Sequence, residues 1–355
     1  MNRYLTPRRH ELVVLVCALA IALTLGALTA LASATTPGRN GLIAFTRYRL
    51  QDNPLWSEIY VVSPDGNGLH RVSSSTRAVV DNHAQWSPDG TRIVFDRCTP
   101  NVCSIWMVDA DGTHQHRITA FCPDRPPPAC PDDSFPSFAP DGRHIVYVHV
   151  ASPIIHLASG EDQAMSSEIV WRDLRSGNVT VLRRNGLSGG YEDLEVSPDG
   201  TSLSFRIENS SRGRPANGKA LYVADLHGGP QQRITPWSLR GENGTWAPGG
   251  SRILFASDLA AGHLAPGTNL YAVRPDGTGL RRLTNVGPDH YTLAGSYSPD
   301  GMSIVYATDL DATPKPSSGT TFADVVSVPL TGGPVTQITH SANLDAWPTW
   351  GAATG

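Results

Sequence analysis

The stretch Trp86-Ser87-Pro88-Asp89-Gly90 decides the fold, because close copies of it return along the chain at near-constant intervals. Proline fixes φ near the value that the second residue of a type I turn needs, aspartate suits the next position, and glycine takes the left-handed fourth. Each copy is therefore predicted to be a tight turn that the chain enters from an aromatic or apolar residue. The other copies are Phe138-Ala139-Pro140-Asp141-Gly142, Val196-Ser197-Pro198-Asp199-Gly200, Trp246-Ala247-Pro248-Gly249-Gly250 and Tyr297-Ser298-Pro299-Asp300-Gly301.

A short strand is predicted after each turn, as in Ile93-Val94-Phe95, where the two large side chains share one face. The same pattern occurs at 43–45, 145–147, 203–205, 253–255 and 304–306. A second strand, such as Leu221-Tyr222-Val223, and a third strand that ends like Arg233-Ile234-Thr235 follow in most copies. The chain is thus predicted to contain six copies of a unit made of several strands.

The period of the repeat predicts the architecture. From Gly41 through Gly90, Gly142, Gly200 and Gly250 to Gly301 the steps run from 49 to 58 residues. A repeat of about 40 to 50 residues with four strands is typical of a propeller blade. The chain ends on Ala346-Trp347-Pro348-Thr349-Trp350-Gly351, which resembles the approach to a turn. We therefore expect an all-β, six-bladed propeller of four-stranded antiparallel blades, with the first blade closed by the C-terminal strand.

The repeat resembles that of TolB-type propellers, the periplasmic component of the Tol-Pal envelope system. The Trp-Ser-Pro-Asp-Gly turn, the Ile-x-Phe strand, the Ile-Tyr-Val strand and the Arg-Ile-Thr strand end carry the resemblance, which covers residues 41–351. It implies a six-bladed propeller in the cell envelope. Only residues 35–40 separate the N-terminal apolar segment from the first strand, so we expect no counterpart of the α/β domain that precedes the propeller in TolB.

Residues 1–34 are predicted to direct export. Arg3, Arg8 and Arg9 precede an apolar run from Leu12 to Leu31, and Ala32-Ser33-Ala34 offers the small residues that a signal peptidase reads. The same run is long enough to span a membrane. We therefore expect either a cleaved signal peptide, which we favour, or an N-terminal membrane anchor. The protein would then be periplasmic or extracellular.

Charge restricts the class of partner. The whole chain has 28 Lys and Arg against 32 Asp and Glu, and removal of residues 1–34 changes the net charge from −4 to −6. An acidic product with scattered basic residues argues against nucleic acid or an anionic membrane surface as the partner. A membrane contact is expected only through an uncleaved leader. We expect a monomer, because a closed ring leaves few free strand edges.

Four cysteines of the exported part suggest disulfides, because their number is even and their spacing is short. Cys98 and Cys103 flank a predicted hairpin, and Cys122 and Cys130 lie in a proline-rich link to the next blade. Local pairing is the interpretation we adopt. Crossed pairing and a four-thiolate zinc site remain alternatives, although the spacing lacks the usual tight Cys-x-x-Cys.

The longest loops are expected at one end of the ring, at 150–167, 208–219, 257–269 and 309–321, and long loops on a rigid scaffold commonly carry binding. The linkers between blades reach the same end. They carry acidic, amide and histidine residues just before each innermost strand, and we expect these at one register around the mouth of the central channel. The candidates are Asp81, His83, Asp132, Asp133, Glu192, Asp193, Glu242, Asn243, His290 and Asp345.

Two functions fit such a rim. The first is a non-enzymatic module that binds an envelope or secreted protein or peptide through the long-loop face. The second is a polysaccharide lyase or hydrolase that uses channel-mouth carboxylates and His83 or His290 as an acid/base pair. A structural role for the same side chains, bonding to nearby backbone, is a third interpretation. No catalytic residue, metal ligand or cofactor is assigned, and a cation at the channel mouth is left open.

Overall fold

The computed structural model is built almost wholly of antiparallel strands, with one three-residue 3-10 helix, Trp237–Leu239, among the residues that it describes. The leader (1–34), Cys122 and Cys130 lie outside these residues, which belong to one compact unit, Ala32–Gly355. In the part of the chain described, no helix is long and apolar enough to cross a membrane. The described residues are 36–49, 52, 55–100, 102–120, 131–150, 154–156, 162–164, 167–185, 190–209, 218–257, 268–287, 290–309 and 322–355.

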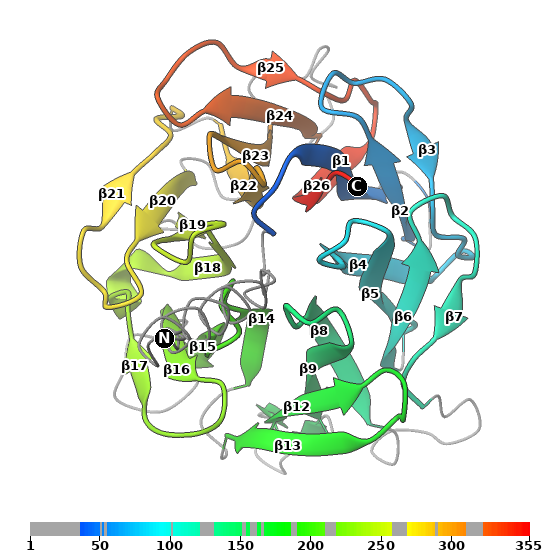
Figure 1. The fold of residues 1–355 in the computed structure, drawn as a ribbon, viewed down its shortest axis with the longest axis vertical. Helices are drawn as coiled ribbons and strands as arrows, with labels where there is room; N and C mark the ends of the chain where they lie inside the picture. Colours follow the sequence, from blue (N-terminus) through cyan, green and yellow to red (C-terminus); the bar gives the residue numbers. More distant parts are fainter. Residues whose placement is uncertain are drawn as a thin grey trace, which may run out of the picture. The chain divides into compact units, whose positions relative to one another are not determined.

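Six four-stranded blades surround a central axis, and in blades 2 to 6 the first strand along the chain is the innermost (Figure 1). Blades 2 to 6 follow the chain order. Their strands are β4 (Val80–Trp86), β5 (Arg92–Cys98), β6 (Cys103–Asp109) and β7 (His116–Arg117); β8 (Asp132–Phe138), β9 (His144–Val150), β12 (Ser167–Asp173) and β13 (Val179–Arg184); β14 (Tyr191–Val196), β15 (Ser202–Asn209), β16 (Gly218–Asp225) and β17 (Gln231–Arg233); β18 (Gly241–Trp246), β19 (Ile253–Ser257), β20 (Asn269–Val273) and β21 (Arg281–Arg282); and β22 (Thr292–Tyr297), β23 (Ser303–Thr308), β24 (Asp324–Pro329) and β25 (Thr336–Gln337).

Blade 1 is made from both ends of the propeller segment, as expected. The C-terminal strand β26 (Leu344–Ala352) is innermost and pairs antiparallel with β1 (Asn40–Tyr48), which pairs with β2 (Ser57–Val62), and β3 (His70–Arg71) lies outermost. Blades 1 and 2 are joined by a single parallel bridge between Ser57 and Val80. The indole nitrogen of Trp350 donates to the Gly41 carbonyl at 3.1 Å. These contacts close the ring without a covalent bond.

The core lies between blades and is filled by the aromatic residue of the predicted Ile-x-Phe strand. Phe45, Phe95, Phe205 and Phe255 are completely buried, and each comes from the second strand of its blade. Burial of such a side chain stabilises the fold by roughly 1.5–3 kcal/mol relative to exposure. One sheet has two faces to cover, so each blade is stable only between its neighbours.

The repeated turns have the predicted geometry. In blade 2 the Gly90 N–H donates to the Ser87 carbonyl at 2.9 Å, the Ser87 hydroxyl donates to Asp89 at 2.6 Å, and Gly90 has a φ of 69°. Successive turns also contact one another, since a Cβ added at Gly200 would lie 3.3 Å from Pro140 of the preceding blade. The turns therefore form a connected rim at one end of the ring, which we call the turn end.

A β-bulge interrupts the innermost strand of every blade at the same register, which the sequence analysis did not anticipate. Pairing slips between Asn82 and Gln85 in β4, and it slips at the equivalent place in the other five inner strands. The residue at the bulge has a left-handed backbone in five of the strands. These residues are His83, Phe135, Asp193, Asn243 and Trp347, with φ between 50° and 53°.

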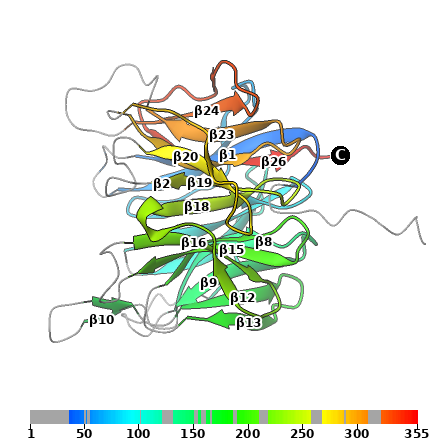
Figure 2. The same cartoon turned by 90° about the vertical axis from the view of Figure 1, so that its left-hand side faces the viewer.

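The two ends of the ring differ in their connections. Short turns join strands at the turn end, where the C-terminus also lies (Figure 2). At the other end, the long-loop end, a small hairpin of β10 (Ile154–His156) and β11 (Asp162–Ala164) projects from blade 3. The inner strands begin at the long-loop end, so the bulges lie near it. Most of the long loops themselves lie outside the described residues.

Candidate functional site

The bulges gather one residue from each of five inner strands around the central channel. The five left-handed residues His83, Phe135, Asp193, Asn243 and Trp347, here called the mouth ring, all line one cavity on the axis. Its volume is about 60 Å³. Because one buried water needs roughly 10–15 Å³ on this measure, the channel at this depth has room for a few waters or one slender side chain.

The ten residues expected at the rim occupy several registers rather than one, which corrects the sequence-based expectation. Of the ten, only His83, Asp193 and Asn243 line the axial cavity. The bulge inserts a residue into each inner strand, so side chains one or two positions before it point away from the axis. The other seven lie in two acid–cation arrangements or at strand starts.

Asp81, Asp133 and Asp345 form the first arrangement, two residues before the bulge in blades 2, 3 and 1. All three are buried, and each faces a basic residue directly across on the second strand of its own blade. Arg97 donates to Asp81 at 2.6 and 2.8 Å, His149 contacts Asp133 at 2.7 Å, and Arg47 donates to Asp345 at 2.6 and 2.8 Å. Burial raises the pKa of Asp81 even though Arg97 acts to lower it.

Glu192, Asp193 and Glu242 form the second arrangement, around the buried Arg206 of β15. The Arg206 guanidinium contacts Glu192 and lies 2.8 Å from Asp193 and 3.7 Å from Glu242. The Lys219 ammonium lies 2.8 Å from Glu242, which is on the next blade. Burial lowers the pKa of Arg206, and the nearby acidic residues oppose that effect. Blades 4 and 5 are therefore joined by an acid-rich cluster.

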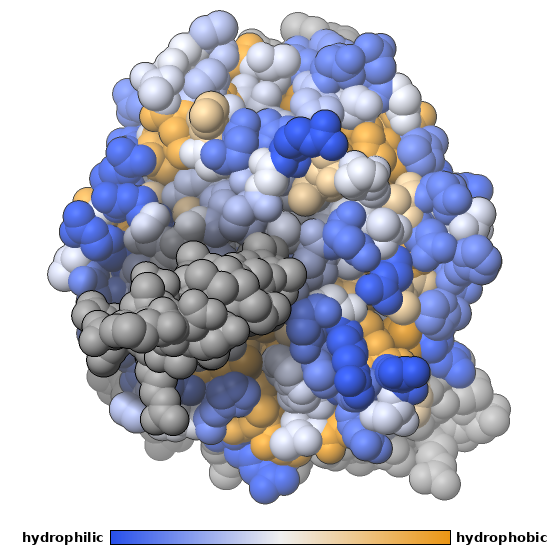
Figure 3. All heavy atoms as spheres, viewed as in Figure 1, coloured by the Kyte–Doolittle hydropathy of each residue, from blue (hydrophilic) through white to orange (hydrophobic). Residues whose placement is uncertain are grey.

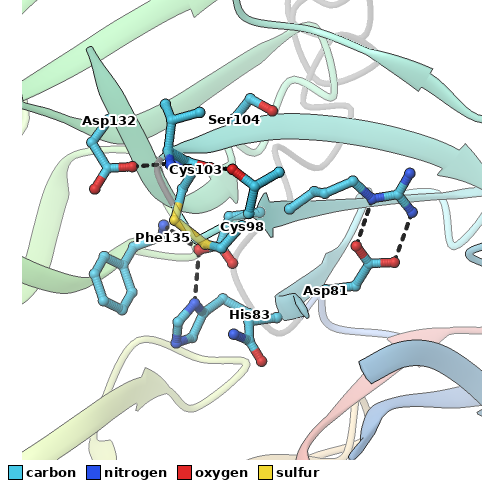
Figure 4. Close-up of a disulfide and its surroundings, with 12 residues drawn as sticks. Asp81, His83, Cys98, Cys103, Ser104, Asp132 and Phe135 are labelled. Carbon is cyan, nitrogen blue, oxygen red and sulfur yellow. Dashed lines mark hydrogen bonds and ion pairs between the residues drawn. A yellow bond between two sulfur atoms is a disulfide. The ribbon is translucent and has the colours of Figure 1, made fainter. Parts of the chain in front are cut away.

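His83 is held by a carboxylate at the channel mouth (Figure 4). Its Nδ1 lies 2.8 Å from Asp96 of β5, and its ring packs 4.3 Å from that of Phe135. The Phe135 N–H donates to the same Asp96 oxygen at 3.0 Å. Burial lowers the pKa of His83, but the Asp96 carboxylate outweighs it, so the pKa is raised overall. The pair is a histidine and carboxylate dyad that faces the axial cavity.

The remaining expected residues have local partners. Asp132 accepts a hydrogen bond from the Cys103 N–H at 2.6 Å, beside the Cys98–Cys103 disulfide (Figure 4). That disulfide confirms the local pairing of these two cysteines, whereas Cys122 and Cys130 lie outside the described residues. His290 precedes β22, with its Nδ1 3.4 Å from Asp309. In the described part of the chain, no group of three or more His, Cys, Asp or Glu is arranged to hold a metal ion.

A second ring of polar residues lies two positions after the bulges, and the sequence analysis missed it. Several of these side chains bond to the backbone of the next blade; for example, Glu195 accepts from the Trp246 N–H at 2.8 Å and Ser296 from the Trp350 N–H at 2.8 Å. Burial raises the pKa of Glu195 to about 8. A signal was present, because the residue before the aromatic or apolar start of each turn is always polar. The ring consists of Gln85, Ser137, Glu195, Thr245, Ser296 and Thr349.

Comparisons with known proteins identify the fold. No family profile and no curated protein sequence matches the chain. Among solved structures, TolB from Acinetobacter baumannii aligns with a TM-score of 0.62 at 20% identity over 87% of this chain and 66% of that one. A putative TolB from Agrobacterium tumefaciens aligns with a TM-score of 0.55 at 17% identity, over 86% and 91%. An oligogalacturonate lyase in complex with manganese aligns with a TM-score of 0.51 at 14% identity, over 81% and 72%.

Proposed function

We propose that this chain, which has a TolB-like propeller fold, is an exported, non-enzymatic module that binds a protein or peptide partner through its long-loop end. The mouth ring would anchor one side chain of that partner. The observation that carries the proposal is the set of residues at the bulges. The same left-handed bulge position in five of the six blades holds a histidine, a phenylalanine, an aspartate, an asparagine and a tryptophan.

The choice of these residues is not explained by the architecture. A left-handed backbone is adopted most readily by glycine, and asparagine, aspartate and histidine are enriched there, whereas a strained residue costs about 1–3 kcal/mol. Asn243, Asp193 and His83 follow that preference, but Phe135 and Trp347 do not. Strained backbone that persists is commonly retained for a functional reason. Aromatic side chains such as Phe135 and Trp347, with polar neighbours, are also the type that dominates binding energy at interfaces.

The chemistry of the mouth suggests what it would accept. Phe135 and Trp347 offer apolar surface, while Asp193 and Glu195 add carboxyl groups to the same cavity. A slender side chain with an apolar stem and a polar or basic end fits both kinds of group. The narrow cavity would exclude a whole backbone, so the rest of the partner would contact the long loops. Residues 1–34, with their basic and apolar pattern, support an exported location for this role.

The proposal is tested by crosslinking the full-length protein in intact cell envelopes and recovering its partners. The informative variant is Phe135→Gly combined with Trp347→Gly, because glycine relieves the left-handed backbone while it removes both anchoring side chains. The control is Met302→Ala at the turn end, where Met302 is 69% exposed. We expect one crosslinked protein with the wild type and the control, and its loss with the double variant. Equal recovery from all three proteins would refute an anchor at the mouth ring.

One observation favours the enzymatic alternative. The His83 and Asp96 dyad faces the cavity that Glu195 also lines, and burial raises the pKa of Glu195 to about 8. A carboxyl group with a raised pKa and a histidine that line one cavity are a combination used for general acid/base catalysis. A lyase acting on an acidic polysaccharide would release an unsaturated product that absorbs in the ultraviolet. Turnover that His83→Gln abolishes would support this alternative; no turnover of any acidic polysaccharide would leave binding as the function.

A further inference from the structure

A groove between blades 5 and 6 at the turn end differs in charge from its counterpart between blades 1 and 2. The two have similar volumes, about 470 and 480 Å³. Arg252 and Arg281 line the first, whereas Leu42 and His70 take the equivalent positions in the second. Hydrophilic and apolar side chains alternate over this end of the ring (Figure 3). The groove of blades 5 and 6 is thus locally basic on an acidic protein.

Tyr297, which lines this groove, has a hydroxyl group without a partner. Its side chain is 2% exposed, and among the described residues nothing hydrogen-bonds to its buried oxygen. The residue at the equivalent position in blade 2, Trp86, donates from its indole nitrogen to the Thr349 carbonyl at 3.1 Å. Burial raises the pKa of Tyr297 to about 12, while Arg281 and Arg252 act in the opposite direction. Arg252 and Arg281 therefore line the same groove as an unsatisfied phenol.

The turn of blade 5 lacks the carboxylate found in the other turns, since Gly249 stands in the place of aspartate. In blade 2, the charge of Arg92, which is the counterpart of Arg252, acts on Asp89. Burial raises the pKa of Asp89, but hydrogen bonds from Ser87 and Thr91 and the charge of Arg92 lower that pKa overall. Arg252 has glycine, not aspartate, at that turn position and donates to the Gly279 carbonyl at 3.0 Å.

The one carboxylate that lines the groove, Asp300, is already engaged. It accepts hydrogen bonds from the Ser298 hydroxyl at 2.6 Å, the Met302 N–H at 2.9 Å and the Asn40 amide at 2.9 Å. Arg281 is exposed and has no ion-pair partner in the part of the chain described. The groove therefore retains a surplus of positive charge and of hydrogen-bond donors.

We propose that the groove between blades 5 and 6 is a binding site for an oxyanion, such as a phosphate group carried by a ligand. Arg252 and Arg281 would donate to its oxygens, since guanidinium groups match such anions in charge and geometry. The Tyr297 hydroxyl would donate a further hydrogen bond and so gain the partner that it lacks. This site lies at the opposite end of the ring from the mouth ring, and it stands independently of the proposed partner-binding function.

Inorganic phosphate is the probe, titrated into the full-length protein by calorimetry, with chloride at matched ionic strength. We expect saturable binding of phosphate and none of chloride. Arg252→Gln combined with Arg281→Gln should weaken phosphate binding by about tenfold or more, and Tyr297→Phe should weaken it less. Phenylalanine is compatible with the fold there, because Phe138 holds the equivalent position in blade 3. The control Arg282→Gln changes the neighbouring arginine, which donates to the Thr284 carbonyl, and should bind as the wild type does.

Gly249→Asp provides a test that does not depend on weakening the fold. A Cβ at Gly249 meets nothing within 4 Å, and aspartate is the residue of the other turns. The new carboxylate should engage Arg252 and abolish phosphate binding without lowering the melting temperature. Unchanged phosphate affinity in Gly249→Asp or in the double glutamine variant would overturn the proposal. Equal effects of chloride and phosphate on the wild type would overturn it as well.

Discussion

Acidic residues begin the inner strands of blades 1 to 3 and also of blade 4, but the two regions hold them in different ways. Asp345, Asp81 and Asp133 each have one basic residue of their own, directly across the sheet. In blade 4, Glu192 and Asp193 share Arg206, and Asp193 also faces the axial cavity. Acidic residues at the start of an inner strand thus form buried ion pairs within the blade in blades 1 to 3, whereas in blade 4 one of them also lines the channel. The position relative to the bulge decides which, because Glu192 also has a basic residue, Arg206, directly across the strand pair, whereas Asp193 lies at the bulge itself.

The largest effect on stability is expected when the buried ion pair between Arg97 and Asp81 in blade 2 is broken. Arg97→Gln leaves the Asp81 carboxylate, which is completely buried, without its cation. Removing one partner of a buried ion pair costs about 3–5 kcal/mol. Urea unfolding should therefore show a loss of that order in the free energy of unfolding. Adding Asp81→Asn in the same chain should recover part of the loss, and a double variant no more stable than Arg97→Gln would contradict this account.

Glu195, which lines the axial cavity, provides a test of how burial of a carboxyl group affects stability as pH changes. Its pKa, raised to about 8 by burial, lies above the value in the unfolded chain, so the folded state binds the extra proton between about pH 4.5 and 8. Wild-type stability should therefore fall as pH rises through this window. Glu195→Gln mimics the protonated side chain and should flatten the profile, with a gain of up to about 4 kcal/mol at pH 8.

The control for Glu195→Gln is the reverse substitution at the equivalent position of blade 2, Gln85→Glu. If burial raises the carboxyl pKa at this depth of the channel, the new carboxyl group should introduce the same fall of stability with rising pH. Parallel profiles for Glu195→Gln and the wild type between pH 5 and 8 would show that Glu195 is ionised in the folded protein.

A smaller effect is expected in blade 3, where the substitution lowers stability rather than raising it. The hydrogen bond and charge of Asp133 raise the pKa of His149, although burial opposes them. The stabilisation is therefore fully present below the pKa of an unfolded histidine, about 6.5, and is lost as pH rises through the folded pKa. His149→Gln should lower stability by about 1 kcal/mol at pH 5 and by less at pH 9. Chemical unfolding at the two pH values measures the difference, and an equal loss at both would argue against a charged histidine.

The smallest effect is expected at an ion pair outside both regions. Arg184 lies 2.6 Å from Glu168 on the outer strands of blade 3, and its side chain is 71% exposed. Surface pairs of this kind contribute about 0–1 kcal/mol. Arg184→Gln should therefore change the free energy of unfolding by less than about 0.5 kcal/mol, in contrast to Arg97→Gln. A loss as large as that of Arg97→Gln would show that burial does not distinguish these pairs.

The fold was predictable in detail because its signals are short-range. The turn at Ser87 to Gly90, the strand at Ile93 to Phe95 and the Cys98–Cys103 bridge each involve residues within a few positions of one another. The candidate site was predictable only in part. His83, Asp193 and Asn243 reach the cavity, but the bulge that brings them there leaves no recognisable motif, because five unlike residues occupy it.

The sequence by itself determined the number of blades, the closure of the ring and the order of the main strands in each repeat, since a repeated turn and an alternating strand pattern dictate these locally. Only the tertiary structure decided which acidic residues are neutralised. Asp81 meets Arg97 across a hairpin, but Asp345 meets Arg47 only after the ring closes, at a separation of 298 residues. The bulges shift the cross-strand register, and this register together with contacts between blades sets these partners. Neither feature can be inferred from residues that are close together in the sequence.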